Sequence, residues 1–360
     1  MFISSLQNNL IMFSLEKPFE EMAIRYASTF FSVARQCLKP VKSEHVLIIT
    51  DYGSPSHNVA LMMARAYYLG LQQKGYNVHL AIQEEKKGFM HVDEHVRNAL
   101  ERLPPKSVVI VCVSNKLGRF GEKRSFRKFC KENGHRFGSA SGLKDARNSQ
   151  FELFVEAMNV NYVRMQKKGR LIKKLLDKGK QIRVWTEAGT ELLIDIEGMQ
   201  AISNDGNYNE SGRGGNLPAG EVYIAPKGSR GVNGKLVIDG SLRHEKGSTL
   251  ISSPVVLEIK EGRIVSVVGD QAQLLLETFE TFEARAKYPE RVRLIGEFGI
   301  GINSNANLMG VALMDEKVEG TAHIGIGSNS WFGGEIKTIF HGDQTFKDPV
   351  IYIDGKKLEF

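Results

Sequence analysis

The chain has 360 residues, of which 42% are hydrophobic and 25% are charged, so it can bury a sizeable core without disulfides and fits two domains or one large one. The net charge is only +7, and three cysteines, Cys37, Cys112 and Cys130, occur without a CxxC spacing. These features exclude a structural zinc ribbon and favour a reducing, cytoplasmic location. The first 21 residues lack the basic segment of a signal peptide, and no apolar run is long enough to span a membrane.

The first half of the sequence alternates between helical and strand patterns. Apolar residues recur at helical spacing in three segments, 20–38, 57–75 and 90–103. Short β-branched runs lie between or after them, at 44–51, 76–82 and 106–114. Strands that alternate with helices predict an α/β part with a parallel sheet and flanking helices. A further helix over 151–178 is expected to link this part to the rest of the chain.

The second half has the pattern of β-hairpins. Segment 181–198 alternates and turns at Ala188-Gly189, and Asp-Gly or Glu-Gly pairs separate later β-branched runs. One helical segment, 271–288, interrupts this pattern. We therefore predict an α/β domain over 1–180, followed by a β-rich α+β domain over 181–360 that carries the functional site.

The residues with metal-binding chemistry all lie in the second half, close to glycines. They are Glu221, Glu297, His323, His341 and Asp343. Carboxylates bind hard metal ions and imidazoles bind borderline ones. Since alternate side chains of a strand point the same way, His341 and Asp343 could hold one ion together. Nearby glycines would leave room for the ion and a substrate.

These residues stand in motifs with the order of a known family. The strings "NLPAGEV", "GEFGIGIN", "DEKVEGTAHIGIG" and "FHGD" resemble the aminopeptidase T family of thermophilic-type, dinuclear metallo-aminopeptidases. The resemblance covers about 181 to the C-terminus and continues more loosely into "HVLIITDYGSPSHNVALMMARAYYLG". It implies that Glu221, Glu297, His323, His341 and Asp343 bind two divalent ions, such as Zn, Co, Mn or Mg.

The resemblance implies an enzyme that removes N-terminal residues from peptides with a free N-terminus. Two metal ions about 3.5–4 Å apart would activate a bridging water, with Glu221 or Glu297 as the candidate general base. The resemblance also implies a homodimer, and exposed strand edges favour one. That family carries a tyrosine about seven residues after its first histidine, whereas this chain has the Ser330 region there.

Two other functions remain open. A relative of the same fold holds one ferrous ion with two histidines and an aspartate and opens a dihydroxypyridine ring, and His323, His341 and Asp343 would suit that chemistry. Alternatively, basic runs at 115–136 and 163–183, the first with interleaved phenylalanines, could bind nucleic acid without catalysis. Lysines and arginines on amphipathic helices more often form a solvated face, so nucleic acid is not the expected partner.

Overall fold

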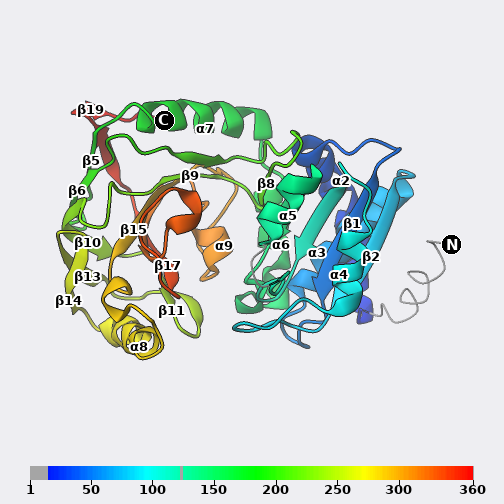
Figure 1. Cartoon of the computed structure of the whole chain (residues 1–360), viewed down its shortest axis with the longest axis horizontal. Coiled ribbons are helices and arrows are strands. Elements are labelled where there is room, and N and C mark those ends of the chain that lie inside the picture. Colours follow the sequence, from blue (N-terminus) through cyan, green and yellow to red (C-terminus); the bar gives the residue numbers. More distant parts are fainter. Residues whose placement is uncertain (1–14, 122–124, 360) are drawn as a thin grey trace. The chain divides into compact units, whose positions relative to one another are not determined.

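The computed structural model describes residues 15–121 and 125–359 (Figure 1). Contacts divide the chain into two compact units, Met1–Tyr162 with Gly206–Ala219, and Val163–Asp205 with Gly220–Phe360. In the described residues, no helix has the length and apolar character needed to cross a membrane. The first 14 residues, which include most of the segment argued not to be a signal peptide, lie outside the described part.

The first unit is built on a parallel five-stranded sheet with the order β2-β1-β3-β4-β8. The strands are β1 (His45–Asp51), β2 (Asn77–Gln83), β3 (Val108–Cys112), β4 (Arg136–Ala140) and β8 (Gly214–Asn216). The predicted α/β layer is therefore confirmed. Its last strand, β8, comes from the second half of the sequence, because residues 206–219 return to this unit.

Helices cover the sheet and follow the predicted order. They are α2 (Lys17–Val33), α3 (Val59–Gln73), α4 (Glu94–Glu101), α5 (Phe126–Asn133) and α6 (Phe151–Met158). The helix predicted over 151–178 is two helices, α6 and α7 (Tyr162–Leu176). The interruption falls at Asn159, Val160 and Asn161, where asparagines favour local turns over continued helix.

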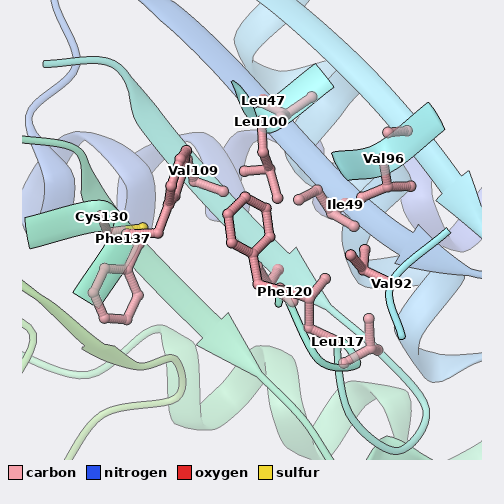
Figure 2. Close-up of a cluster of buried hydrophobic side chains, with 14 residues drawn as sticks. Leu47, Ile49, Val92, Val96, Leu100, Val109, Leu117, Phe120, Cys130 and Phe137 are labelled. Carbon is pink, nitrogen blue, oxygen red and sulfur yellow. The ribbon is translucent and has the colours of Figure 1, made fainter. Parts of the chain in front are cut away.

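One face of the parallel sheet packs against α4 and α5 through a hydrophobic cluster (Figure 2). Leu47 and Ile49 of β1 contribute to it, together with Phe120 and Phe129 from the first basic run. Phe126 packs against the same cluster. Phe120 and Phe129 are therefore core residues and Phe126 is partly buried, which weakens the aromatic part of the nucleic-acid hypothesis.

The second unit is antiparallel and rich in β-structure, as predicted. A seven-stranded sheet has the order β14-β13-β10-β6-β5-β18-β19, and a five-stranded sheet has the order β17-β16-β15-β9-β7. The strands of the first sheet are β5 (Gln181–Trp185), β6 (Glu191–Asp195), β10 (Val232–Ile238), β13 (Val255–Lys260), β14 (Arg263–Val268), β18 (Val350–Ile353) and β19 (Lys356–Lys357). Three of its hairpins, β5/β6, β13/β14 and β18/β19, turn where the sequence predicts.

The five-stranded sheet carries the candidate site. Its strands are β7 (Ile202–Asn204), β9 (Glu221–Ile224), β15 (Ile295–Gly301), β16 (Thr321–Gly327) and β17 (His341–Lys347). A two-stranded sheet, β11 (Ser241–His244) and β12 (Gly247–Leu250), and the helices α8 (Ala272–Glu283) and α9 (Ala312–Asp315) complete this unit. Strands β15 and β16 are buried along their whole length, so the side chains between them are shielded from water.

Candidate metal centre

The five residues predicted as metal ligands come together on the five-stranded sheet. Glu221 begins β9, Glu297 lies on β15, His323 on β16, and His341 and Asp343 on β17 (Figure 1). The register sets residues 341 and 343 of β17 opposite residues 327 and 325 of β16. Alternate residues of a strand share a face, and paired residues share it with their partners. One face of the sheet therefore collects carboxylates and imidazoles from four strands.

Glycine occupies the centre of this face. Gly325 is paired with both Glu297 and Asp343. A Cβ added there would lie 2.6 Å from Glu297 Cβ, 2.9 Å from Asp343 Oδ1 and 3.0 Å from His341 Cε1. The space around these three side chains thus exists because residue 325 has no side chain.

Gly299 has the same role on the neighbouring strand. It is paired with His323, and an added Cβ would lie 2.0 Å from His323 Nε2. The imidazole of His323 therefore lies flat over the backbone of β15. Gly299 and Gly325 thus leave the space in which the His323 ring and the carboxylates lie.

The donors form two groups that share one residue. In the described part of the chain, Glu221, Glu297 and His323 make one set with ligand atoms within 4.8 Å of one another, and Glu297, His341 and Asp343 make the other. Glu297 Oε1 lies 3.4 Å from His323 Nε2, while Glu297 Oε2 lies 3.6 Å from His341 Nε2. Each carboxylate oxygen of Glu297 therefore faces a different histidine.

The trio proposed for a single iron, His323, His341 and Asp343, is not one of these compact groups. His323 Nε2 points toward Glu297 and toward Glu221 Oε2, which is 3.7 Å away. His341 Nε2 instead faces Asp343 Oδ1 at 3.3 Å. The two imidazoles lie on opposite sides of Glu297, so a compact set on the His341 side contains one histidine and two carboxylates.

One buried, unsatisfied polar atom of the Glu297–His341–Asp343 group suits a bound cation. Asp343 Oδ1 is buried and has no hydrogen bond of acceptable geometry, and such atoms are rare without a function. His341 Nδ1 lies 2.8 Å from the Ser328 carbonyl, which can only accept, so Nδ1 donates and Nε2 is left to face Asp343. This backbone support of the second ring nitrogen is usual for metal-bound histidine. The donor atoms are oxygen and imidazole nitrogen, which suit Mn, Fe or Zn.

The charges of the centre act on one another strongly. Burial by itself lowers the pKa of His341, but the charge of Asp343 outweighs it and raises the pKa to about 10. Burial is likewise outweighed at His323, where the Glu297 contact and the charge of Asp343 raise the pKa to about 9. Burial raises the pKa of Glu297. Burial also tends to raise the pKa of Asp343, but the charge of His341 outweighs it and keeps the pKa of Asp343 low. Without metal, the positive charges of the protonated histidines balance the negative charges of the carboxylates.

A fully buried lysine contacts the same centre. Lys317 is 0% exposed, and its Nζ donates to Glu221 Oε1 at 2.6 Å and also to Glu316. The charges of Glu221 and Glu316 outweigh burial and raise the pKa of Lys317, so it is an ammonium. Burial, followed by the charge of Glu221, raises the pKa of Glu316 to about 8. Sequence reasoning gave Lys317 no role, although it stands in the quoted "DEKVEG" string.

An exposed tryptophan lies beside the centre. The short 3₁₀-helix Ser330–Phe332 covers the region where the resemblance would place a tyrosine. Its Trp331 is 54% exposed and meets the His341 ring edge to face, with ring centroids 4.8 Å apart. Phe332 supports Trp331 at 5.2 Å. A large aromatic residue in a glycine-rich segment was the feature of the sequence that could have identified Trp331 as a candidate site residue.

Solved structures of the same fold include two enzymes. A 2,5-dihydroxypyridine dioxygenase from Pseudomonas putida KT2440 superposes with a TM-score of 0.72 at 17% identity, covering 93% of this chain and 95% of that chain. AmpT from Thermus thermophilus superposes with a TM-score of 0.62 at 14% identity, covering 93% and 97%. At these identities the likeness establishes a shared fold. The expected relation to aminopeptidase T is therefore supported as a fold and not as that family.

The family comparison is more specific. No curated protein matches the chain. The model of the family described as NicX, 2,5-dihydroxypyridine 5,6-dioxygenase, matches residues 156–358. This range is more than half of the chain, and it includes all five residues of the candidate centre and Lys317. The chain therefore belongs to the family described as NicX, 2,5-dihydroxypyridine 5,6-dioxygenase.

Proposed function

We propose that the protein is a metal-dependent dioxygenase that opens the ring of a hydroxylated aromatic nitrogen heterocycle. The observation that carries this proposal is the family match over residues 156–358, combined with a buried oxygen and nitrogen donor group inside that range. This reading replaces the aminopeptidase expectation as the first candidate. It also keeps the ring-opening alternative that the sequence left open.

In this proposal Glu297, His341 and Asp343 hold one ferrous ion. The set differs from the usual two-histidine, one-carboxylate set of non-haem iron oxygenases, because it contains Glu297 in place of His323 of the expected trio. A bound ferrous ion would supply the redox chemistry that a reaction of dioxygen with an organic ring requires. The backbone carbonyl of Ser328 orients His341, and Gly325 leaves the space that the ion needs.

The surroundings of the donors suit a planar, hydroxylated substrate. Trp331 offers an exposed aromatic surface next to His341, and aromatic rings stack on such surfaces with useful energy. His323 is buried, and its Nε2 faces Glu297 Oε1 at 3.4 Å, so it holds this carboxylate in place. A ring held between Trp331 and the donor group would present its hydroxyls to these polar atoms.

Anaerobic reconstitution tests the proposal. The protein is loaded with Fe(II) and mixed with air-saturated buffer and a panel of dihydroxylated pyridines and benzenes, while oxygen uptake and loss of ring absorbance are followed. We expect uptake with at least one dihydroxypyridine. Asp343→Asn keeps the shape of the side chain but removes the charge, so it should abolish uptake.

The matched control is Asp348→Asn, just after the same strand. Asp348 is exposed and has a positive φ of 51°, a conformation that asparagine also tolerates. Asp348→Asn should consume oxygen at the wild-type rate. The proposal fails if the iron-loaded wild type consumes no oxygen with any member of the panel.

A two-metal aminopeptidase is the second candidate, favoured by one observation. Glu297 belongs to both donor groups, as a carboxylate that bridges two metal ions would. The test is hydrolysis of free and N-blocked peptides by protein loaded with Zn, Co or Mn. Cleavage restricted to unblocked peptides, without any oxygen uptake, would make this the function.

A further inference from the structure

We propose that Lys317 is a built-in cation that takes the place of a second metal ion beside Glu221, so that the centre holds one metal ion per chain. The ion would lie in the Glu297–His341–Asp343 group. This inference rests on the proposed metal centre, but not on the identity of the ring substrate. Lys317 acts here as a positioning residue, because it contacts a donor and not the reacting atoms.

The contacts of Glu221 carry the first step. Its Oε1 accepts from Lys317 Nζ at 2.6 Å and from Asn204 Nδ2 at 2.8 Å. Both donors are buried, so water does not compete with them. One oxygen of this carboxylate is therefore already satisfied, and only Oε2 faces His323. Glu221 thus enters the centre with its charge already balanced by an ammonium group.

Electrostatics supports the same conclusion. A metal ion bound to Glu221 Oε2 would lie a few ångströms from the ammonium of Lys317, inside a region that solvent does not screen. Repulsion between positive charges at such distances is strong when the surroundings are poorly polarisable. The lysine cannot turn away into water, since its side chain is completely buried and held by Glu221 and Glu316. A dication therefore binds less well in the Glu221 group.

In the described part of the chain, no lysine forms an ion pair with Glu297, His341 or Asp343, although the charge of Lys317 still acts on Asp343. Asp343 Oδ1 is buried without a hydrogen bond, and His341 is oriented by the Ser328 carbonyl. Glu297 offers Oε2 to this side and Oε1 to His323. The two donor groups are similar in composition, but one lysine makes their affinities for a metal ion unequal.

Metal titration tests the inference. Purified metal-free protein is titrated anaerobically with Mn(II), and the number of bound ions is measured by calorimetry and by elemental analysis after gel filtration. The wild type should bind one equivalent and give the electron spin resonance spectrum of isolated Mn(II). Lys317→Met removes the ammonium beside Glu221, so this variant should bind two equivalents with a spin-coupled spectrum. Lys317→Arg keeps the charge and should stay at one.

Lys86→Met is the matched control. Lys86 is also buried, with a side chain that is 3% exposed and paired with Asp93, but it belongs to the other unit. It should bind one equivalent. Two equivalents on the wild type would overturn the inference, and so would one equivalent on folded Lys317→Met. If Lys317→Met does not fold, the number of Mn(II) ions bound by the wild type and by Lys317→Arg tests the inference. Two ions on either protein would overturn it.

The result separates this inference from the proposed function. One Mn(II) on the wild type and two on Lys317→Met would support the inference even if no tested ring is opened. Two ions on the wild type would overturn it while leaving the metal centre in place. No bound ion on the wild type would remove the centre itself, and with it both proposals.

Discussion

Replacing Gly325 by alanine should abolish tight metal binding with only a moderate loss of stability. The added Cβ would lie 2.6 Å from Glu297 Cβ and 2.9 Å from Asp343 Oδ1. Carbon atoms normally approach to about 3.5–4.0 Å, so at least one strand or side chain must shift by roughly 1 Å. Overpacking of this kind usually costs about 1–3 kcal/mol of folding free energy.

The effect on metal affinity should be larger than this cost suggests. All three members of the proposed iron group touch the added methyl, since His341 Cε1 would be only 3.0 Å away. Disturbing groups that orient metal ligands typically lowers affinity by about 10–100-fold, and here the ligands themselves move. The assay is Mn(II) titration by calorimetry, with thermal unfolding of the metal-free variant measured in parallel.

Gly299→Ala provides the comparison that can refute this reasoning. Its Cβ would lie 2.0 Å from His323 Nε2, so the variant should be destabilised at least as much as Gly325→Ala. However, it displaces the imidazole on the other side of Glu297, and the proposed single ion should still bind. If Gly325→Ala binds Mn(II) like the wild type, or if Gly299→Ala loses the metal and Gly325→Ala does not, the assignment of the ion is wrong.

Three further predictions can be tested by simple measurements. Trp331→Ala should raise KM for the ring substrate about tenfold, as expected from loss of roughly 1.5 kcal/mol of stacking, while Trp331→Phe loses less; an unchanged KM would exclude stacking. The raised pKa values of His323 and His341, about 9 and about 10, stabilise the metal-free protein fully below pH 6.5, and this stabilisation is lost as pH rises through those values. The melting temperature of the metal-free protein should therefore fall between pH 7 and 10, and less so with Mn(II); a flat profile would contradict the charge balance. Light scattering should report the predicted homodimer, and a monomer at micromolar concentration would contradict it.

Much of the fold was predictable because its signals are local. The strand that became β1 is a short β-branched run, and the hairpin at Asp354-Gly355 has the turn residues that such hairpins need. Local signals fail where the partner is distant. Strand β8 is only Gly214–Asn216, and it joins the parallel sheet through β4, far away in the sequence. A segment of three residues is too short for its side-chain pattern to predict that pairing.

The proximity of the five candidate ligands was predictable for a different reason. Glutamate, histidine and aspartate in glycine-rich strands are chemically distinctive, and the five proposed positions do lie near one another. Their grouping was not predictable, because it depends on the register between β15, β16 and β17. The same register put Glu297 between His323 and His341 and thereby separated the trio first suggested for iron.

Lys317 illustrates why a shared fold does not determine the reaction. The dioxygenase and AmpT superpose on this chain over more than nine-tenths of it, so the fold by itself does not choose the reaction. In our proposal, the number of metal ions depends on what stands beside Glu221. An ammonium at 2.6 Å would leave Glu297 with one metal ion to bind, whereas an uncharged residue there would leave room and negative charge for a second ion. On the proposed assignment, a single buried side chain outside the donor set fixes the number of ions, and through it the chemistry that the sheet can support.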